Sequence, residues 1–236
     1  MKVSKPQISV VIPVYNEEKN ISRILKHLIE NSSPNHIKEI IVVDGGSTDN
    51  TVNLALLNNR ATVIHSNKGR AKQLNFGAQR ATSEIIYFLH ADTFPPKNFD
   101  ESIINTVAQG NKVGCFEMRF DSDSKFLNFF ALLTKINHTI CRGGDQSLFI
   151  TKDFFIEMNG FNESYIIYED NEFIARTYKA TKFTILPDHV KTSARKHRNH
   201  GNVKLQYHFG VIHLKNILGA GPDELHDYYK RNIAIQ

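Results

Sequence analysis

The segment "IIYFLHADT", residues 85–93, decides the fold class. Its apolar run stops abruptly at His90-Ala91-Asp92, which predicts a buried strand that delivers a histidine and a carboxylate to its carboxyl end. Side chains two residues apart point to the same side of an extended chain, so His90 and Asp92 are expected to face one site. Asp92 can bind a divalent metal that also contacts a substrate phosphate, and His90 can be a second ligand or orient the site. Asp92 can equally begin the loop "TFPP".

Three further apolar segments precede this strand, and helical patterns separate all four. Short strands that alternate with helices indicate βαβ units and a mostly parallel sheet, in which ligands bind beyond the carboxyl ends of the strands. The expected strands are residues 8–12, 39–44, 62–65 and 85–90. The side chains expected at that edge, besides His90 and Asp92, are Pro13, Tyr15, Glu17 and Asp44.

The rhythm of the sequence changes after residue 96. Helices are expected at 98–109, around 124–140, within 158–180, at 203–217 and at 222–232, and a strand at 115–120. The last part of the chain, residues 181–236, is rich in His, Lys and Arg. The fold class is therefore α/β, a mostly parallel mixed sheet flanked by helices, with a helical, basic C-terminal extension.

Composition limits the classes of function. Among 236 residues, 41% are hydrophobic and 22% charged, which is ordinary for a soluble globular protein. The net charge of +5 suits phosphates, nucleic acid or an anionic membrane. Cys115 and Cys141 match no metal or redox spacing and predict reduced thiols. With no signal-like start and no apolar run of about 18 residues, a cytoplasmic location is expected, with contact to the inner face of the membrane as an option.

Three polar segments allow both a chemical and a purely structural interpretation. Asp44 can bind a base or ribose, or it can order its own Asp-Gly turn. The acids of "YEDNEF" (168–173) can supply a general base, or they can stabilise a helix N-terminus. The cations of "TSARKHRNHG" (192–201) can form a mobile lid that closes on a diphosphate, contact a membrane, or form a solvated face. Neither a GxGxxG nor a P-loop motif is present.

Four motifs in order, "VVIPVYNE", "IIVVDGGSTDNT", "FLHADT" and "YEDNEF", resemble those of glycosyltransferase family 2. The segments "GRAKQLNFGA" and "GGDQSLFI" are also similar, and "TSARKHRNHG" resembles a bacterial subgroup of short, single-domain members. The resemblance covers about residues 7–187 and implies the GT-A fold. It implies a domain at 1–187, with a nucleotide-binding half (7–96) and an acceptor half (97–187). Residues 188–236 are then an extension packed on the same domain.

The resemblance also implies a role for each matching residue. Asp170, with Glu169 beside it, matches the catalytic base, and Asp92 matches the metal-binding acid. His90 stands where the family's first metal acid usually lies. Gly144, Asp145 and Gln146 are expected to border the acceptor and the sugar. The residues expected to bind the nucleotide are Pro13, Tyr15, Glu17, Asp44, Arg70, Asn75, Asp92 and Arg195.

The implied activity is the transfer of one sugar, with inversion, from a nucleoside-diphosphate sugar to an acceptor hydroxyl. A UDP-sugar is the favoured donor, Mn²⁺ or Mg²⁺ the cofactor, and a lipid-linked or small-molecule compound the acceptor. Three alternatives stay open: a sugar nucleotidyltransferase, a non-catalytic basic protein that binds nucleic acid, and a degenerate glycosyltransferase that binds a nucleotide and does no chemistry, which only His90 favours. The second lacks an aromatic-interleaved basic stripe, so no nucleic-acid partner is expected.

Overall fold

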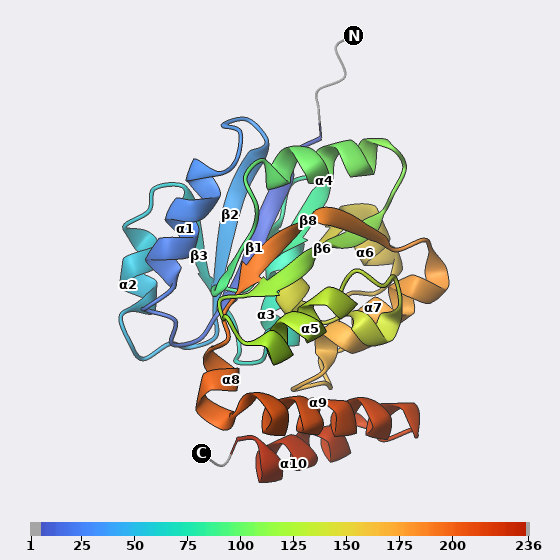
Figure 1. Ribbon diagram of the computed structural model, residues 1–236. Coiled ribbons are helices and arrows are strands. Elements are labelled where there is room, and N and C mark those ends of the chain that lie inside the picture. Colours follow the sequence, from blue (N-terminus) through green and yellow to red (C-terminus); the bar gives the residue numbers. More distant parts are fainter. Residues whose placement is uncertain (1–5, 235–236) are drawn as a thin grey trace.

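A computed structural model describes residues 6–234 of the chain. The described residues form one eight-stranded sheet with the order β3-β2-β1-β4-β7-β6-β8-β5, flanked by helices (Figure 1). The strands are β1 (Ile8–Val14), β2 (Ile37–Asp44), β3 (Ala61–His65), β4 (Ile85–Phe88), β5 (Thr93–Phe94), β6 (Val113–Phe120), β7 (Leu148–Thr151) and β8 (Thr184–Thr192).

Helices connect these strands and extend the chain beyond them. The α-helices are α1 (Ile21–Glu30), α2 (Thr51–Leu56), α3 (Arg70–Arg80), α4 (Phe99–Ala108), α5 (Lys125–Leu133), α6 (Lys152–Glu157), α7 (Glu169–Ala180), α8 (Arg195–His200), α9 (Asn202–Ile217) and α10 (Pro222–Asn232). Two short 3₁₀ helices, η1 (Thr139–Cys141) and η2 (Gly144–Gln146), precede β7.

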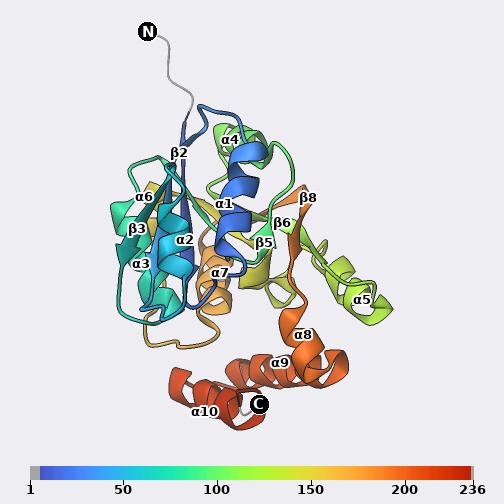
Figure 2. The same ribbon diagram turned by 90° about the vertical axis from the view of Figure 1, so that its left-hand side faces the viewer.

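Burial of both sheet faces explains the uninterrupted apolar runs of the first strands. In β1, Val10 and Ile12 pack under α1 and α4, whereas Val11 packs on the opposite side with α3. Figure 2 shows α1 and α4 on one side of the sheet and α3 and α6 on the other. Strands β3, β2, β1 and β4 are mutually parallel, as predicted, so their carboxyl ends share one edge.

The other half of the sheet is mixed. Strand β7 runs antiparallel to β4 and β6, and β8 runs parallel to β6 but antiparallel to β5. Of seven neighbouring strand pairs, four are therefore parallel. Strand β8 was not expected from the sequence, because its nine residues include Pro187 and a mostly polar, half-exposed pattern. The predicted boundary between residues 187 and 188 lies inside this strand.

Two local expectations were wrong, and two helices were missed. Strand β4 ends at Phe88, so Leu89 and His90 follow it as loop residues. The helix expected at 124–140 ends at Leu133, before the polar residues that follow Thr134. Helix α6 was missed, and so was α8, which lies inside the segment interpreted as a lid.

The C-terminal helices form a hairpin below the edge where β1, β2 and β4 end (Figure 1). Buried Leu205 and Ile212 of α9 and Leu225 of α10 pack with Tyr165 and Tyr168 of the loop that leads into α7. The hairpin therefore supports that loop from outside the sheet. None of the helices within residues 6–234 has the length and apolar character that crossing a membrane requires.

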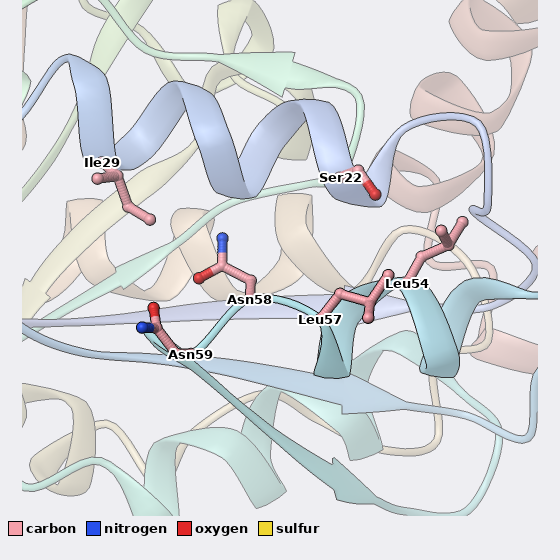
Figure 3. Close-up of a pocket in the computed structure, with 6 residues that line it drawn as sticks. All are labelled: Ser22, Ile29, Leu54, Leu57, Asn58 and Asn59. Atoms are coloured by element: carbon pink, nitrogen blue, oxygen red, sulfur yellow. The ribbon is translucent and has the colours of Figure 1, made fainter.

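A hollow of about 440 Å³ lies between α1 and the end of α2 (Figure 3). Its lining contains apolar, amide and hydroxyl side chains and no titratable group, and none of the residues predicted for the site contributes to it. These residues are Ser22, Ile29, Leu54, Leu57, Asn58 and Asn59. This hollow is therefore separate from the predicted site at the carboxyl edge of the sheet.

A prediction about packing concerns two helical glycines. A Cβ at Gly77 of α3 would overlap Val11 Cγ1 and stand 2.9 Å from Val43 Cγ2, whereas a Cβ at Gly210 of α9 meets no atom within 4 Å. Gly77→Ala is expected to lower the free energy of unfolding by about 1–3 kcal/mol through overpacking. Gly210→Ala, the matched control, is expected to raise it by about 0.5–1 kcal/mol because alanine is the better helix former. Urea unfolding of both variants measures this, and equal effects would contradict the close packing of α3 on β1.

Candidate active site at the carboxyl edge of the sheet

The first element of the site is the turn after β2. The carboxylate of Asp44 is buried and accepts hydrogen bonds from the backbone N–H groups of Gly46 (3.0 Å) and Ser47 (3.1 Å). Its Oδ2 also lies 3.3 Å from His65 Nδ1. Burial alone would raise the pKa of Asp44, but these hydrogen bonds outweigh it and lower the pKa. Asp44 therefore orders its own turn, and it remains an ionised acceptor at the edge of the sheet.

Gln73, which sequence reasoning missed, holds the ends of β1 and β2 together. Its buried Nε2 donates to the carbonyl oxygens of Val14 and Val43, each at 2.8 Å. A Cβ at Gly45 would lie 3.0 Å from the same amide, so a glycine at that position lets the two approach. The detectable signal was a glutamine on the otherwise apolar face of α3.

The loop after β1 carries Tyr15 and Glu17 beside the Asp44 turn. Asn16 adopts a left-handed conformation (φ 54°), and its Oδ1 accepts from the N–H of Thr48 at 2.8 Å. Tyr15 is 40% exposed, and Lys68 Nζ lies 3.7 Å from the centre of its ring. An exposed ring next to a cation can stack on a nucleobase. Pro13 belongs to β1 itself, opposite Val43.

Asp92 lies beside Glu17 and Arg195. The Arg195 guanidinium donates to Glu17 Oε1 at 2.8 Å and lies 3.9 Å from Asp92 Oδ2. Burial is the main reason that the pKa of Asp92 is raised, and the charges of Asp145 and Glu17 add to it, while His90 and Arg195 oppose it. Arg195 therefore supplies positive charge to two carboxylates that come from separate loops.

Strand pairing brings Arg195 to this position. Thr93 of β5 pairs with Thr192 of β8, and their hydroxyl oxygens are 3.0 Å apart. Asp121 then fixes the start of α8, because its Oδ1 accepts from the N–H of Ala194 at 2.5 Å and lies 3.1 Å from Arg198 Nη1. The residue after Asp92 and a residue shortly before Arg195 are thus joined in one ladder.

A second acid pair begins α7. Arg70 Nη1, from the first residue of α3, lies 3.0 Å from Glu169 Oε1 and 3.7 Å from Asp170 Oδ2. Burial first, and then the charges of Glu169 and Asp145, raise the pKa of Asp170, while His90 and Arg70 lower it; the net result is a pKa of about 6. Arg70 was expected near the nucleotide, and the structure places it against these two acids.

His90 lies between two further carboxylates. Its Nδ1 is 3.5 Å from Asp145 Oδ1, and its Nε2 is 3.9 Å from Asp170 Oδ2. A Cβ on Gly144 would overlap Asp170 Oδ2 and stand 3.0 Å from His90 Cε1. The glycine at 144 is therefore what lets η2 approach Asp170 so closely.

Two of the predicted site residues hold loops in place. Asn75 exchanges hydrogen bonds of 2.9 Å with the backbone N–H and carbonyl of Phe161 and reaches Glu163. Gln146 is buried, and its Nε2 donates to the carbonyl of Cys141 at 3.2 Å. The amide groups of both side chains are thus used within the protein.

Sequence reasoning also missed two supporting groups. Buried Arg142 donates to the carbonyl oxygen of Ile136 at 2.6 Å, and its own carbonyl accepts from Asn171 of α7 at 2.7 Å. Tyr168, directly before the acids, adopts φ 72°, and its hydroxyl lies 2.7 Å from His213 Nδ1 of α9. These contacts fix both sides of the turn that presents Asp170, and they join residues too far apart in sequence for a local pattern to reveal them.

Comparison with known proteins identifies the family. The description "Glycosyl transferase family 2" applies to the family model that matches residues 9–181, most of the chain. The chain belongs to glycosyltransferase family 2. The predicted resemblance is therefore confirmed, and it extends through the Asp44, Asp92 and Asp170 motifs.

Curated relatives agree with this membership. The chain is 32% identical over 133 residues to glycosyltransferase GlyG of Streptococcus pneumoniae, covering 54% of this chain and 44% of GlyG. It is 26% identical over 209 residues to an uncharacterized glycosyltransferase of Haemophilus influenzae, covering 81% of this chain and 79% of that protein. The chain thus spans less than half of GlyG but most of the second relative.

Solved structures of glycosyltransferases share the fold. TarS 1–349 of S. aureus in complex with UDP gives a TM-score of 0.68 at 19% identity, covering 79% of this chain and 60% of that chain. Mannosyltransferase PcManGT of Pyrobaculum calidifontis in complex with GDP-Man and Mn²⁺ gives 0.69 at 18% identity, covering 96% and 70%. The predicted GT-A fold is confirmed.

The paired acids of α7 allow a prediction about Asp170. Glu169→Gln removes a like charge next to Asp170, so the pKa of Asp170 is expected to fall below about 6. Glu172→Gln is the matched control, because Glu172 lies on the same helix but pairs with Arg176 at 2.6 Å. A ¹³C NMR titration of the Asp170 carboxyl carbon measures both variants. An unchanged or higher pKa in Glu169→Gln would contradict the assigned cause.

Proposed function

We propose that this protein transfers a single sugar from a nucleoside-diphosphate sugar to an acceptor hydroxyl, with inversion at the anomeric carbon. One observation carries the proposal: Asp170, held between Arg70 and His90, lies at the sheet edge that also presents Asp44 and Asp92. The three proposed functional carboxylates come from three separate motifs: Asp170 as the base, Asp44 on the nucleotide and Asp92 on the diphosphate. Family membership supports the same reaction class.

The nucleotide is proposed to bind along the ends of β1 and β2. Asp44 accepts hydrogen bonds from the base or ribose, and the exposed ring of Tyr15 with Lys68 above it lies beside that turn. Arg195 is proposed to move from Glu17 to the diphosphate, because an arginine fork matches phosphate oxygens well. A UDP-sugar is the favoured donor. Pro13, Glu17, Arg70 and Asn75 stay predictions for the nucleotide pocket.

The residues present fit a divalent metal on the diphosphate. Asp92 has neighbouring like charges in Glu17 and Asp145, an arrangement that a cation stabilises. Within residues 6–234, no group of three or more His, Cys, Asp or Glu side chains could hold a metal ion, so phosphate oxygens and water would complete the coordination. Asp92 is proposed as the main ligand of Mn²⁺ or Mg²⁺, and His90 stays the predicted second one. The metal would neutralise charge on the leaving diphosphate.

Asp170 is proposed as the general base. With a pKa of about 6 it is mostly ionised at neutral pH and can still accept a proton from the attacking hydroxyl. Arg70 and His90 keep its carboxylate in place, and Glu169 holds Arg70. The acceptor oxygen attacks the anomeric carbon from the face opposite the diphosphate, so the configuration inverts.

The acceptor is proposed to enter past η2. Asp145 has a side chain that is 60% exposed, and it points to His90 from the rim of the same site. Gly144 and Asp145 are proposed to border the sugar and the acceptor, and Gln146 contributes by holding this turn. We propose a lipid-linked or small-molecule compound as the acceptor. The proposed location is cytoplasmic, with contact to the inner face of the membrane.

A substitution of Asp170 tests the proposed reaction. Asp170→Asn is expected to lower transfer by about 10²–10⁴-fold while leaving donor binding unchanged, because only the proton acceptor is lost. Transfer by the wild type is expected to rise with pH through about 6, as Asp170 becomes ionised. Glu172→Gln is the control variant, because Glu172 lies on the same helix but pairs with Arg176, and its transfer rate is expected to stay unchanged.

Product analysis with UDP-, GDP- and dTDP-sugars decides between the enzyme classes. Release of nucleoside diphosphate supports glycosyl transfer, whereas exchange of pyrophosphate into the donor would show a nucleotidyltransferase. A filter-binding assay over a salt series tests the nucleic-acid alternative, since phosphate-driven binding falls steeply with salt. Full activity of Asp170→Asn would refute the assigned base.

Another prediction concerns the metal. Asp92→Asn is expected to abolish the part of donor binding that depends on Mn²⁺ and to keep the metal-independent part, because Asp44 and Tyr15 are unchanged. Calorimetry with and without Mn²⁺ separates the two parts. Asp123→Asn, an exposed acid before α5, serves as the control. Equal metal dependence in Asp92→Asn and wild type would remove Asp92 from the metal site.

A further inference from the structure

Exposed apolar side chains gather on two helices that contact each other. Among the described residues, fifteen large hydrophobic side chains are exposed; eight of them belong to α5 with its C-terminal turn or to α9 with the residue after it, and a ninth, Ile140, belongs to η1. Those nine are Phe129, Leu132, Ile136, Ile140, Val203, Tyr207, Leu214, Ile217 and Leu218. Such a concentration on one part of a surface marks an interaction site.

Helix α9 is apolar on two opposite faces. Leu205 and Ile212 point inward and are buried, whereas Val203, Tyr207 and Leu214 recur at spacings of four and seven residues and are 65%, 65% and 55% exposed. At 100° per residue this second set forms one stripe opposite the buried one. The packing of the hairpin explains only the inner face.

Neighbouring contacts show that the outer stripe of α9 is open. The helix meets α10 on one flank, where His208 Nδ1 lies 2.8 Å from Tyr228 Oη and Lys215 pairs with Glu224. On the other flank it meets the loop of Tyr168 through His213. Both flanks contact protein, and the stripe between them faces away from the sheet.

Helix α5, which contacts α9, carries further exposed apolar side chains. Phe129 and Leu132 lie on α5, Ile136 follows in the next turn, and each is more than half exposed. Asn202 at the start of α9 donates to Ser124, the N-cap of α5, at 3.0 Å. Both views place α5 and α9 at the end of the molecule that carries the C-terminal hairpin, with α5 projecting from the sheet in Figure 2.

The charge of this region indicates its partner. Residues 193–218 contain five cationic side chains, Arg195, Lys196, Arg198, Lys204 and Lys215, and no Asp or Glu. Lys204 forms no salt bridge with any residue in the described range 6–234, so its charge is available to a ligand, whereas the charge of Lys196 acts on Asp145 and lowers the pKa of that carboxyl. A second copy of the same basic face would be repelled, whereas an anionic lipid surface would be attracted.

We propose that the outer faces of α9 and α5 bind an anionic phospholipid bilayer, with the exposed apolar side chains in the interfacial region and the lysines among the headgroups. Helices with an apolar face and cations beside it lie in the plane of the interface, and a tyrosine such as Tyr207 suits that depth. Since α8 joins α9 to Arg195, the bound surface holds the carboxyl edge of the sheet close to the bilayer. The proposal concerns lipid binding alone and does not require sugar transfer.

Vesicle sedimentation of the full chain tests the proposal. The wild type is expected to sediment with vesicles of phosphatidylcholine and phosphatidylglycerol and at least tenfold less with phosphatidylcholine alone. The double variant Tyr207→Glu/Leu214→Glu is expected to lose this binding, and Lys204→Ala to weaken it about fivefold. Leu57→Glu is the control, because Leu57 is 82% exposed and lies in the C-terminal turn of α2, outside α5 and α9, and the binding of this variant is expected to stay unchanged.

Thermal unfolding and donor binding of each variant show whether it is folded. A folded wild type that binds neither kind of vesicle overturns the proposal. Equal binding by the double variant, or equal loss in Leu57→Glu, does the same. Sedimentation velocity tests whether a second copy of the chain occupies this face instead. That would be the conclusion if the wild type bound no vesicles but associated with itself, and if Tyr207→Glu/Leu214→Glu abolished the self-association. Failure of sugar transfer with retained lipid binding would refute only the proposed function.

Discussion

Repulsion between like charges is the constraint that shapes the site. Five carboxylates, from Glu17, Asp92, Asp145, Glu169 and Asp170, converge on one edge of the sheet, where partial burial makes their repulsion stronger than in water. Three cationic or protonatable side chains from different segments lie next to these carboxylates and partly compensate their charge: Arg70, His90 and Arg195. Burial first, and then the charges of the neighbouring carboxylates, raise the pKa values of Asp92 and Asp170, which suits a site that receives a cation or a proton.

Two different parts of the fold position the carboxylates of the site. Backbone hydrogen bonds to Asp44 and the amide of Gln73 tie the ends of the parallel strands, so the Asp44 side of the site rests on the sheet itself. Asp170 instead follows a loop, and its position depends on Gly144, Arg142 and the Tyr168–His213 contact with the C-terminal hairpin. Changes in the hairpin therefore affect the position of Asp170 more directly than that of Asp44.

The sequence allowed the parallel half of the fold and the position of Asp44 and Asp92 at its carboxyl edge to be predicted, because both are encoded locally. Strands buried on both faces are uninterrupted apolar runs; Asp44 is the last residue of one such strand, and Asp92 follows another after a short loop. Strand β8 escaped because its residues are polar and half exposed, and it depends on β6 and β5 for its existence. The partners of Arg70, His90 and Asn75 escaped for a related reason: each is set by contacts between distant segments, and no short pattern records them.

Strand β8 has a consequence for the order in which the molecule is assembled during synthesis. Thr93 finds its partner 99 residues later in the chain, and Glu17 finds Arg195 178 residues later. The parallel strands β1 to β4 can emerge from the ribosome and pair long before either contact exists. A nascent chain that ends before residue 192 carries Glu17 and Asp92 without the arginine beside them. Glu17 and Asp92 therefore gain the positive charge of Arg195 only after residue 195 has emerged, and a chain stalled before that point would hold a sheet whose acidic edge is still uncompensated.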